Sequence, residues 1–174
     1  MNRLYQSNSS NDFYTVKKNN PKIMKTSDFA ITLLVDQTPG EVFRAINNVR
    51  GWWTEDMEGN SKKMNDEFTV RFFDDIHVST QKLVEVVPKK KVVWLVTKSQ
   101  LNFLDNKKEW TGTKIRFELA ENDGKTQIHF THLGLVPESE CYKDCSVGWK
   151  RYITGSLLPL ITIGKGMPEL KPTT

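Results

Sequence analysis

Both cysteines of the chain lie close to one of its three histidines in the sequence. Cys141 and Cys145 are four positions apart, and His132 precedes the first of them by nine positions. Two thiols on one helical face and a nearby imidazole could ligate zinc, which takes four ligands, or three and an open position. A redox pair is a second hypothesis, but a bridge across a regular helical turn strains disulfide geometry. A third interpretation, which we favour, packs the cysteines under a helix that closes over a pocket. We therefore assign no metal ligand.

Catalytic chemistry has little support in the residue pattern. Nucleophilic catalysis needs a Ser, Cys or Thr beside an oriented base, and Cys145 with His132 is the sole candidate pair, without an elbow motif around either residue. The acidic pairs Asp74-Asp75 and Glu55-Asp56 fall in turn-like segments, where solvation explains them. Because the chain also lacks a glycine-rich phosphate loop, we predict no catalytic residue and no cofactor.

The residues that favour a ligand-binding site are aromatic side chains on segments expected to surround a cavity. An ordinary core would use the same residues, but apolar pockets with few polar groups are typical small-molecule sites. His132 and Tyr152 are the candidate polar groups of such a pocket, since a histidine offers one donor and one acceptor. The predicted ligand-binding residues are Trp52, Trp53, Phe72, Trp94, Phe117, Phe130, His132, Cys145, Trp149 and Tyr152.

These residues are positioned by a strand, a short helical region, about five further strands and a long helix. Residues 28–36 are β-branched and apolar, which predicts a strand. Thr38, Pro39 and Glu41 then form a capping box with a pre-set first helical turn. The following strands are expected at 67–73, 77–87, 92–98, 111–121 and 126–135. The last two alternate apolar and polar residues around "NDGK", which predicts an antiparallel hairpin with one covered face.

A long helix is predicted to begin at Pro137, with Glu138 and Glu140 in its first turn, where negative charge is favourable. Its apolar residues recur every three or four positions and form one buried stripe. Pro159 is expected to bend its last turns, and glycines end the helix near Gly164. The stripe consists of Cys145, Trp149, Tyr152, Ser156 and Leu160. A curved sheet must bury such a helix on its concave face, and the imperfect fit between them favours a cavity.

Composition and charge limit the classes of protein to be considered. The chain has 174 residues, of which 37% are apolar and 26% charged, as in a soluble domain with a real core. Its net charge of +4 arises entirely in residues 1–27, so the remainder has no excess charge to attract nucleic acid. No segment is apolar enough to span a membrane. We predict a polar, disordered tail over residues 1–27, one domain over 28–168 and a C-terminal tail over 169–174.

The order of elements and motifs resembles the START-like, or SRPBCC, superfamily with its helix-grip fold. Within that superfamily, the chain resembles the domain named after the activator of the Hsp90 ATPase homologue. The matching segments, in order, are "TPGEVFRAI", "WW", "VEVVPKKKVVW", "GTKIRFELAENDGKTQIHFTHLGL" and "GWKRYITGSLLPLITIGKGMP". The resemblance implies an α+β fold in which a curved antiparallel sheet wraps around a long C-terminal helix, with two short helices after the first strand.

The resemblance also defines three functional hypotheses. Family members bind hydrophobic or amphipathic small molecules in the cavity, which is the function we predict here, without catalysis. Others assist chaperones, so an Hsp90-type chaperone is an alternative partner. A third group catalyses cyclisation, and a cyclase or dehydratase would need a buried acid or histidine pair facing the cavity. Because the tail lacks the apolar region of a secretory signal and cysteines are sparse, a cytoplasmic location with reduced thiols is expected.

Overall fold

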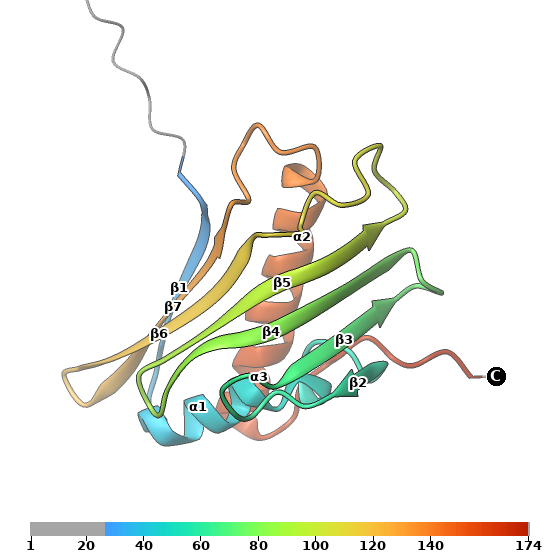
Figure 1. Ribbon diagram of the computed structural model, residues 1–174. Helices are drawn as coiled ribbons and strands as arrows, with labels where there is room; N and C mark the ends of the chain where they lie inside the picture. The colour runs from blue at the N-terminus through green and yellow to red at the C-terminus, as the bar shows by residue number, and fades with distance from the viewer. Residues whose placement is uncertain (1–26, 174) are drawn as a thin grey trace, which may run out of the picture.

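The computed structural model describes residues 27–173 and shows a strongly curved sheet crossed by helices on one face (Figure 1). The strands are β1 (Phe29–Val35), β2 (Met57–Gly59), β3 (Glu67–Phe72), β4 (His77–Val87), β5 (Lys91–Leu101), β6 (Lys114–Asn122) and β7 (Lys125–Leu133). The helices are α1 (Pro39–Asn47), the 3₁₀ turn Val49–Gly51, α2 (Tyr142–Tyr152), a π-helical segment Ile153–Leu157 and α3 (Leu158–Ile163). The predicted helix-grip architecture is confirmed.

All pairings within the sheet are antiparallel, in the order β1-β7-β6-β5-β4-β3-β2 for the described residues. The β6–β7 hairpin closes through Asp123 and Gly124, both with positive φ, as the "NDGK" motif predicts. The first strand pairs with the last along its whole length. Strand β2 was not predicted, because its three residues are too few to show an alternating pattern.

Helix α1 begins as its sequence predicts. The side chain of Thr38 accepts a hydrogen bond from the backbone N–H of Glu41, and the Glu41 carboxylate accepts one from the backbone N–H of Thr38. These reciprocal bonds form the capping box. The pKa of Glu41 is lowered by the hydroxyl group of Thr38, which also donates to its carboxylate, and by the backbone N–H of Thr38. Helix α1 and the 3₁₀ turn after it lie at one end of the sheet (Figure 1).

The C-terminal helix differs from its prediction at its start and agrees with it at its end. It begins at Tyr142 rather than Pro137, because residues 136–141 form hydrogen-bonded turns centred on Ser139. The bend expected from Pro159 takes the form of the π-helical segment, which separates α2 from α3. Gly164 ends α3 in the left-handed conformation, as predicted.

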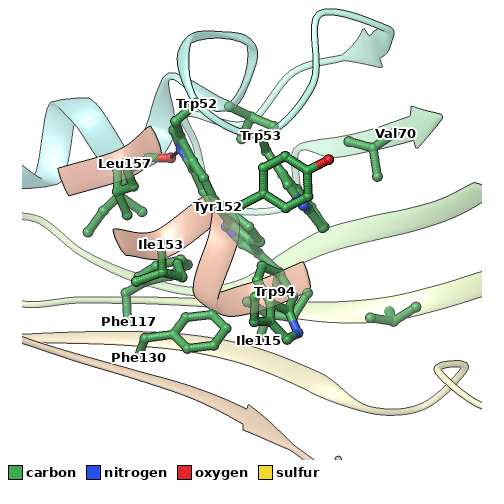
Figure 2. Packing of buried hydrophobic residues seen from close by; sticks show 14 of the residues in the cluster. Trp52, Trp53, Val70, Trp94, Ile115, Phe117, Phe130, Tyr152, Ile153 and Leu157 are labelled. Atoms are coloured by element: carbon green, nitrogen blue, oxygen red, sulfur yellow. Dashed lines mark hydrogen bonds between the residues drawn. The ribbon is translucent and has the colours of Figure 1, made fainter. Parts of the chain in front are cut away.

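The core between the sheet and α2 is filled by indole rings. All five tryptophans of the chain form a continuous set of stacked rings, in the order Trp110, Trp149, Trp53, Trp52, Trp94. Neighbouring ring centroids lie 5.1–6.4 Å apart. Figure 2 shows Trp52 and Trp53 between the helical segments and the strand that carries Trp94. We call these five residues the tryptophan column. Together with the other buried side chains of the core, it restricts the space left for a cavity.

The predicted N-terminal tail lies almost entirely outside the described residues. The domain boundary at residue 168 stays a prediction, although residues beyond it contact the domain: Glu169 exchanges backbone hydrogen bonds with Trp53 and Glu55. No helix within residues 27–173 is both long and apolar enough to cross a membrane.

Candidate functional site

An apolar pocket with a volume of about 280 Å³ lies at the end of the sheet away from α1. Its residues come from the segment between the 3₁₀ turn and β2, the end of β3, the β3–β4 turn, the start of β4, the β5–β6 connection and α2. They are Trp53, Phe72, Phe73, Ile76, His77, Phe103, Trp110, Asp144, Cys145, Gly148, Trp149 and Tyr152. This volume is near the lower limit for small-molecule sites, which suits a ligand of one or two rings.

The mouth of the pocket is formed by three exposed apolar side chains. Phe73 and Ile76 in the β3–β4 turn are 48% and 46% exposed, and Phe103 in the β5–β6 connection is 43% exposed. Asn102 joins the two loops, because its backbone N–H donates to the carbonyl of Ile76 and its side chain donates to the carbonyl of Asp75. We call Phe73, Ile76 and Phe103 the apolar rim.

One face of α2 forms a wall of the pocket. Residues at positions 144, 145, 148, 149 and 152 share this face, as expected for a period of 3.6 residues. Gly148 leaves part of the wall open, since a Cβ atom added there would meet no atom within 4 Å. Its backbone is ordinary helix, so the missing side chain creates space without a conformational requirement.

Two glutamates hold the β5–β6 connection against the start of α2. The carboxylate of Glu109 accepts hydrogen bonds from the backbone N–H groups of Glu140 (2.7 Å) and Cys141 (2.9 Å). In return, the carboxylate of Glu140 accepts from the backbone of Asp105 and Asn106, and these bonds lower the pKa of Glu140. The exchange fixes the loop that carries Phe103 and Trp110 relative to α2. Glu140, which was predicted in the first turn of the helix, therefore lies before α2 and binds the β5–β6 connection instead.

His132 is fully buried beside the pocket, with both ring nitrogens occupied. Its Nδ1 accepts a hydrogen bond from the indole N–H of Trp149 (2.9 Å), and its Nε2–H donates to Thr113 Oγ1 (2.9 Å), which in turn donates to the carbonyl of Trp110. Burial, with a smaller contribution from the charge of His77, lowers the pKa of His132 to about 3. His132 is therefore neutral and positions two tryptophans of the column.

Tyr152 presents its ring to the pocket, but its hydroxyl group is engaged elsewhere. The hydroxyl donates to the carboxylate of Glu169 (3.0 Å), which also accepts from Arg151 (3.2 Å). Burial, together with the negative charge of Glu169, raises the pKa of Tyr152. Neither polar group predicted from the sequence is thus free toward a ligand in this arrangement.

The structure divides the predicted site residues into two sets. Those that line the pocket are Trp53, Phe72, Cys145, Trp149 and Tyr152. Those buried in the core, and not part of the pocket lining, are Trp52, Trp94, Phe117, Phe130 and His132. The central part of the concave face is closed by side chains, so the pocket is displaced to one end. Ligand contact by either set stays a prediction.

Sequence reasoning missed two polar residues that line the pocket, Asp144 in α2 and His77. His77 is the first residue of β4. It follows the Asp74-Asp75 turn, which drew attention to solvation rather than to the strand behind it. A usable signal was present, because His77, Ser79 and Gln81 alternate on one face of β4 and form a polar series. The apolar rim and Trp110 were missed because they lie on connections rather than on periodic elements.

The cysteines differ from the expected pair of reduced thiols. The structure joins Cys141 and Cys145 as a disulfide across the first turn of α2, with Cα atoms 5.4 Å apart, a separation that a disulfide can span. The turn between them is an ordinary helical one, because the backbone N–H of Cys145 donates to the carbonyl of Cys141 (2.8 Å). In residues 27–173, no group of three or more His, Cys, Asp or Glu side chains is arranged to hold a metal ion.

Comparison with known proteins identifies the family. The family described as activator of Hsp90 ATPase homolog 1-like protein matches residues 36–158. The chain belongs to this family, which agrees with the helix-grip fold and with the resemblance found in the sequence. No curated protein matches the chain.

Solved structures share this fold at low sequence identity. The Aha1 dimer from Colwellia psychrerythraea, solved in solution, is 22% identical with a TM-score of 0.65, over 80% of this chain and 99% of that one. Mll3558 from Rhizobium loti is 16% identical with a TM-score of 0.60, over 78% and 96%. DynU16, a protein of the dynemicin biosynthetic locus, is 13% identical with a TM-score of 0.56, over 82% and 50%. At these identities the likeness shows the fold alone.

Proposed function

We propose that this protein binds a hydrophobic or amphipathic small molecule in the pocket between α2, the β3–β4 turn and the β5–β6 connection, without catalysing a reaction. The observation that carries the proposal is the pocket itself, in which aromatic side chains from five separate segments converge on a space of about 280 Å³. The apolar rim adds exposed hydrophobic surface at the entrance, where water would be displaced by an entering ligand.

The chemistry of the pocket favours binding over catalysis. His132, the histidine on which an enzyme hypothesis would depend, uses both nitrogens to hold Trp149 and Thr113. The one carboxylate on the pocket wall, that of Asp144, is exposed at the mouth rather than buried beside a base. A cyclase or dehydratase remains the alternative with the fewest supporting residues.

The test is a titration with prodan, an uncharged dye of naphthalene size whose emission shifts in apolar surroundings, followed by competition with fatty acids and small aromatic compounds. Binding should quench tryptophan fluorescence, because Trp53, Trp110 and Trp149 line the pocket. We expect saturable binding of one equivalent, with displacement by at least some competitors. If neither the dye nor any competitor binds above the level of a denatured control, the proposal is wrong.

Family membership favours a second candidate function, association with an Hsp90-type chaperone through the surface. The exposed apolar rim is the surface on which to test it. We expect the chain to co-purify with the chaperone homologue of its host and to stimulate its ATPase, and we expect a Phe73→Ser, Phe103→Ser variant to lose both effects. Lack of binding at tens of micromolar would remove this candidate.

The cytoplasmic location expected from the sequence is also a proposal, and cell fractionation tests it.

A further inference from the structure

The hydrogen bonds of His77 determine which of its ring nitrogens carries the proton. Nε2 of His77 lies 3.1 Å from Ser79 Oγ, which lies 2.6 Å from the side-chain amide of Gln81. We assign that amide with its nitrogen donating to the carbonyls of Phe68 and Ser79, because this orientation satisfies both of its ends. Its oxygen then accepts the proton of Ser79, so the oxygen of Ser79 is left to accept from His77 Nε2–H.

The other nitrogen of His77 is consequently an acceptor without a partner in the described part of the chain. Nδ1 carries a lone pair and makes no hydrogen bond within residues 27–173, yet it is not among the buried polar atoms sealed from solvent. His77 lines the pocket, where its ring meets Phe72 and stands edge-on to Trp110 (4.7 Å between centroids). A polar atom in such surroundings gains most from a partner supplied by the ligand.

The charges around the pocket limit what that partner can be. No lysine or arginine lines the pocket, and Asp144 at its mouth repels anions. Burial lowers the pKa of His77 to about 3, so this histidine supplies no positive charge at neutral pH. A carboxylate or phosphate in the pocket would therefore be desolvated without an opposite charge.

From this geometry we infer that the pocket selects an uncharged aromatic molecule carrying a hydroxyl or N–H donor, which is bound by Nδ1 of His77. The inference rests on the proposed ligand-binding function and deepens it by naming the chemical class. The Ser79–Gln81 pair behind His77 makes the recognition specific, because it holds the imidazole in the tautomer that accepts from the ligand.

The experiment compares four naphthalene compounds by their displacement of prodan from the full chain. These are 2-naphthol, which can donate, 2-methoxynaphthalene, which cannot, 2-naphthoate, which is anionic, and 2-naphthylmethylammonium, which is cationic. We expect 2-naphthol to bind about tenfold more tightly than 2-methoxynaphthalene, as for one buried hydrogen bond that the methyl ether leaves unmade. We expect the two charged compounds to bind more weakly than either.

His77→Phe keeps a ring in place and removes the acceptor, so the ratio between 2-naphthol and its methyl ether should fall to about one. His77→Asn places an amide near the position of Nδ1 and should restore part of the preference. His129→Phe is the matched control, since His129 hydrogen-bonds to Thr32 in β1 and does not line the pocket. Thermal unfolding of each variant checks that it is folded, and His77→Leu, which also removes the acceptor, serves if His77→Phe is not.

Each result decides the question. If the naphthol and its ether bind wild type equally, the inference is wrong while the proposed function stands. The inference is also overturned if 2-naphthoate binds most tightly. It is overturned if 2-naphthylmethylammonium binds most tightly, because the ligand would then be recognised by Asp144. A preference for 2-naphthol that persists unchanged in His77→Phe also overturns it. If none of the four compounds and no dye binds, the proposed function fails, and the inference with it.

Discussion

Replacing Gly148 with leucine should block the pocket while stabilising the protein. The open space above this glycine accepts a Cβ without contact, so the new side chain can extend into the pocket. Each of its four carbon atoms occupies about as much space as a water molecule, ~30 Å³, so on the order of 100 Å³ is lost. That is more than a third of a pocket of about 280 Å³.

The expected loss of affinity follows from the contacts that a ligand can no longer make. Excluding two ring carbons from burial costs about 1.6 kcal/mol, which corresponds to more than a tenfold rise in the Kd of prodan. The free energy of unfolding should instead rise by about 0.5–1 kcal/mol, because glycine within a helix is the less stable residue. Titration of the dye and urea denaturation measure the two quantities independently.

Gly155 offers a matched control in the π-helical segment that follows α2. It is exposed, a Cβ added there also meets nothing within 4 Å, and it does not line the pocket. Gly155→Leu should leave the Kd of prodan unchanged. If folded Gly148→Leu binds the dye with wild-type affinity, the dye binds elsewhere and the assignment of the pocket as the site is refuted.

Three further predictions concern stability and are measured by chemical denaturation. Acidification from pH 6.5 to 4.5 should lower the free energy of unfolding by up to about 1.4 kcal/mol per pH unit for each of His132 and His77. Their folded pKa values of about 3 mean that only the unfolded state takes up these protons in that range, so a flat or rising profile contradicts the assignment. Glu109→Ala should cost about 1 kcal/mol through the loss of its cap on the start of α2, and should weaken dye binding by loosening the loop of Phe103; unchanged binding would show that the loop is held otherwise. Thr38→Ala should also cost about 1 kcal/mol but leave dye binding intact, and an equal loss of binding would contradict the separation of α1 from the pocket.

The sequence predicts elements whose cause is local. The capping box at Thr38 and the hairpin turn at Asp123 and Gly124 depend on residues within four positions of one another, and both are confirmed. The start of α2 was misplaced because its cap is the distant Glu109, thirty-one positions away from the residue it caps. A contact between residues so far apart produces no recognisable pattern in the sequence, so the start of α2 could not be predicted from it.

The location of the pocket could not be predicted for a related reason. Aromatic residues on the concave face were correctly expected to be near one another, but whether they line a cavity or fill it depends on how their rings stack. Here Trp52 and Trp94 close the centre, and the space that remains lies beyond Trp110. His77 acquires its role only through that displacement, since it would otherwise stand at the end of a strand beside a solvated turn.

The tryptophan column also has an optical consequence. Dipole–dipole coupling between chromophores falls steeply with distance, and neighbouring indoles here are separated by only 5.1–6.4 Å between centroids. The excitation energy absorbed by any one of the five rings can therefore pass to the others before emission. Because this transfer links Trp52 to Trp110, the anisotropy of tryptophan emission should be low while the core is intact. A rise in anisotropy would show that the rings have separated.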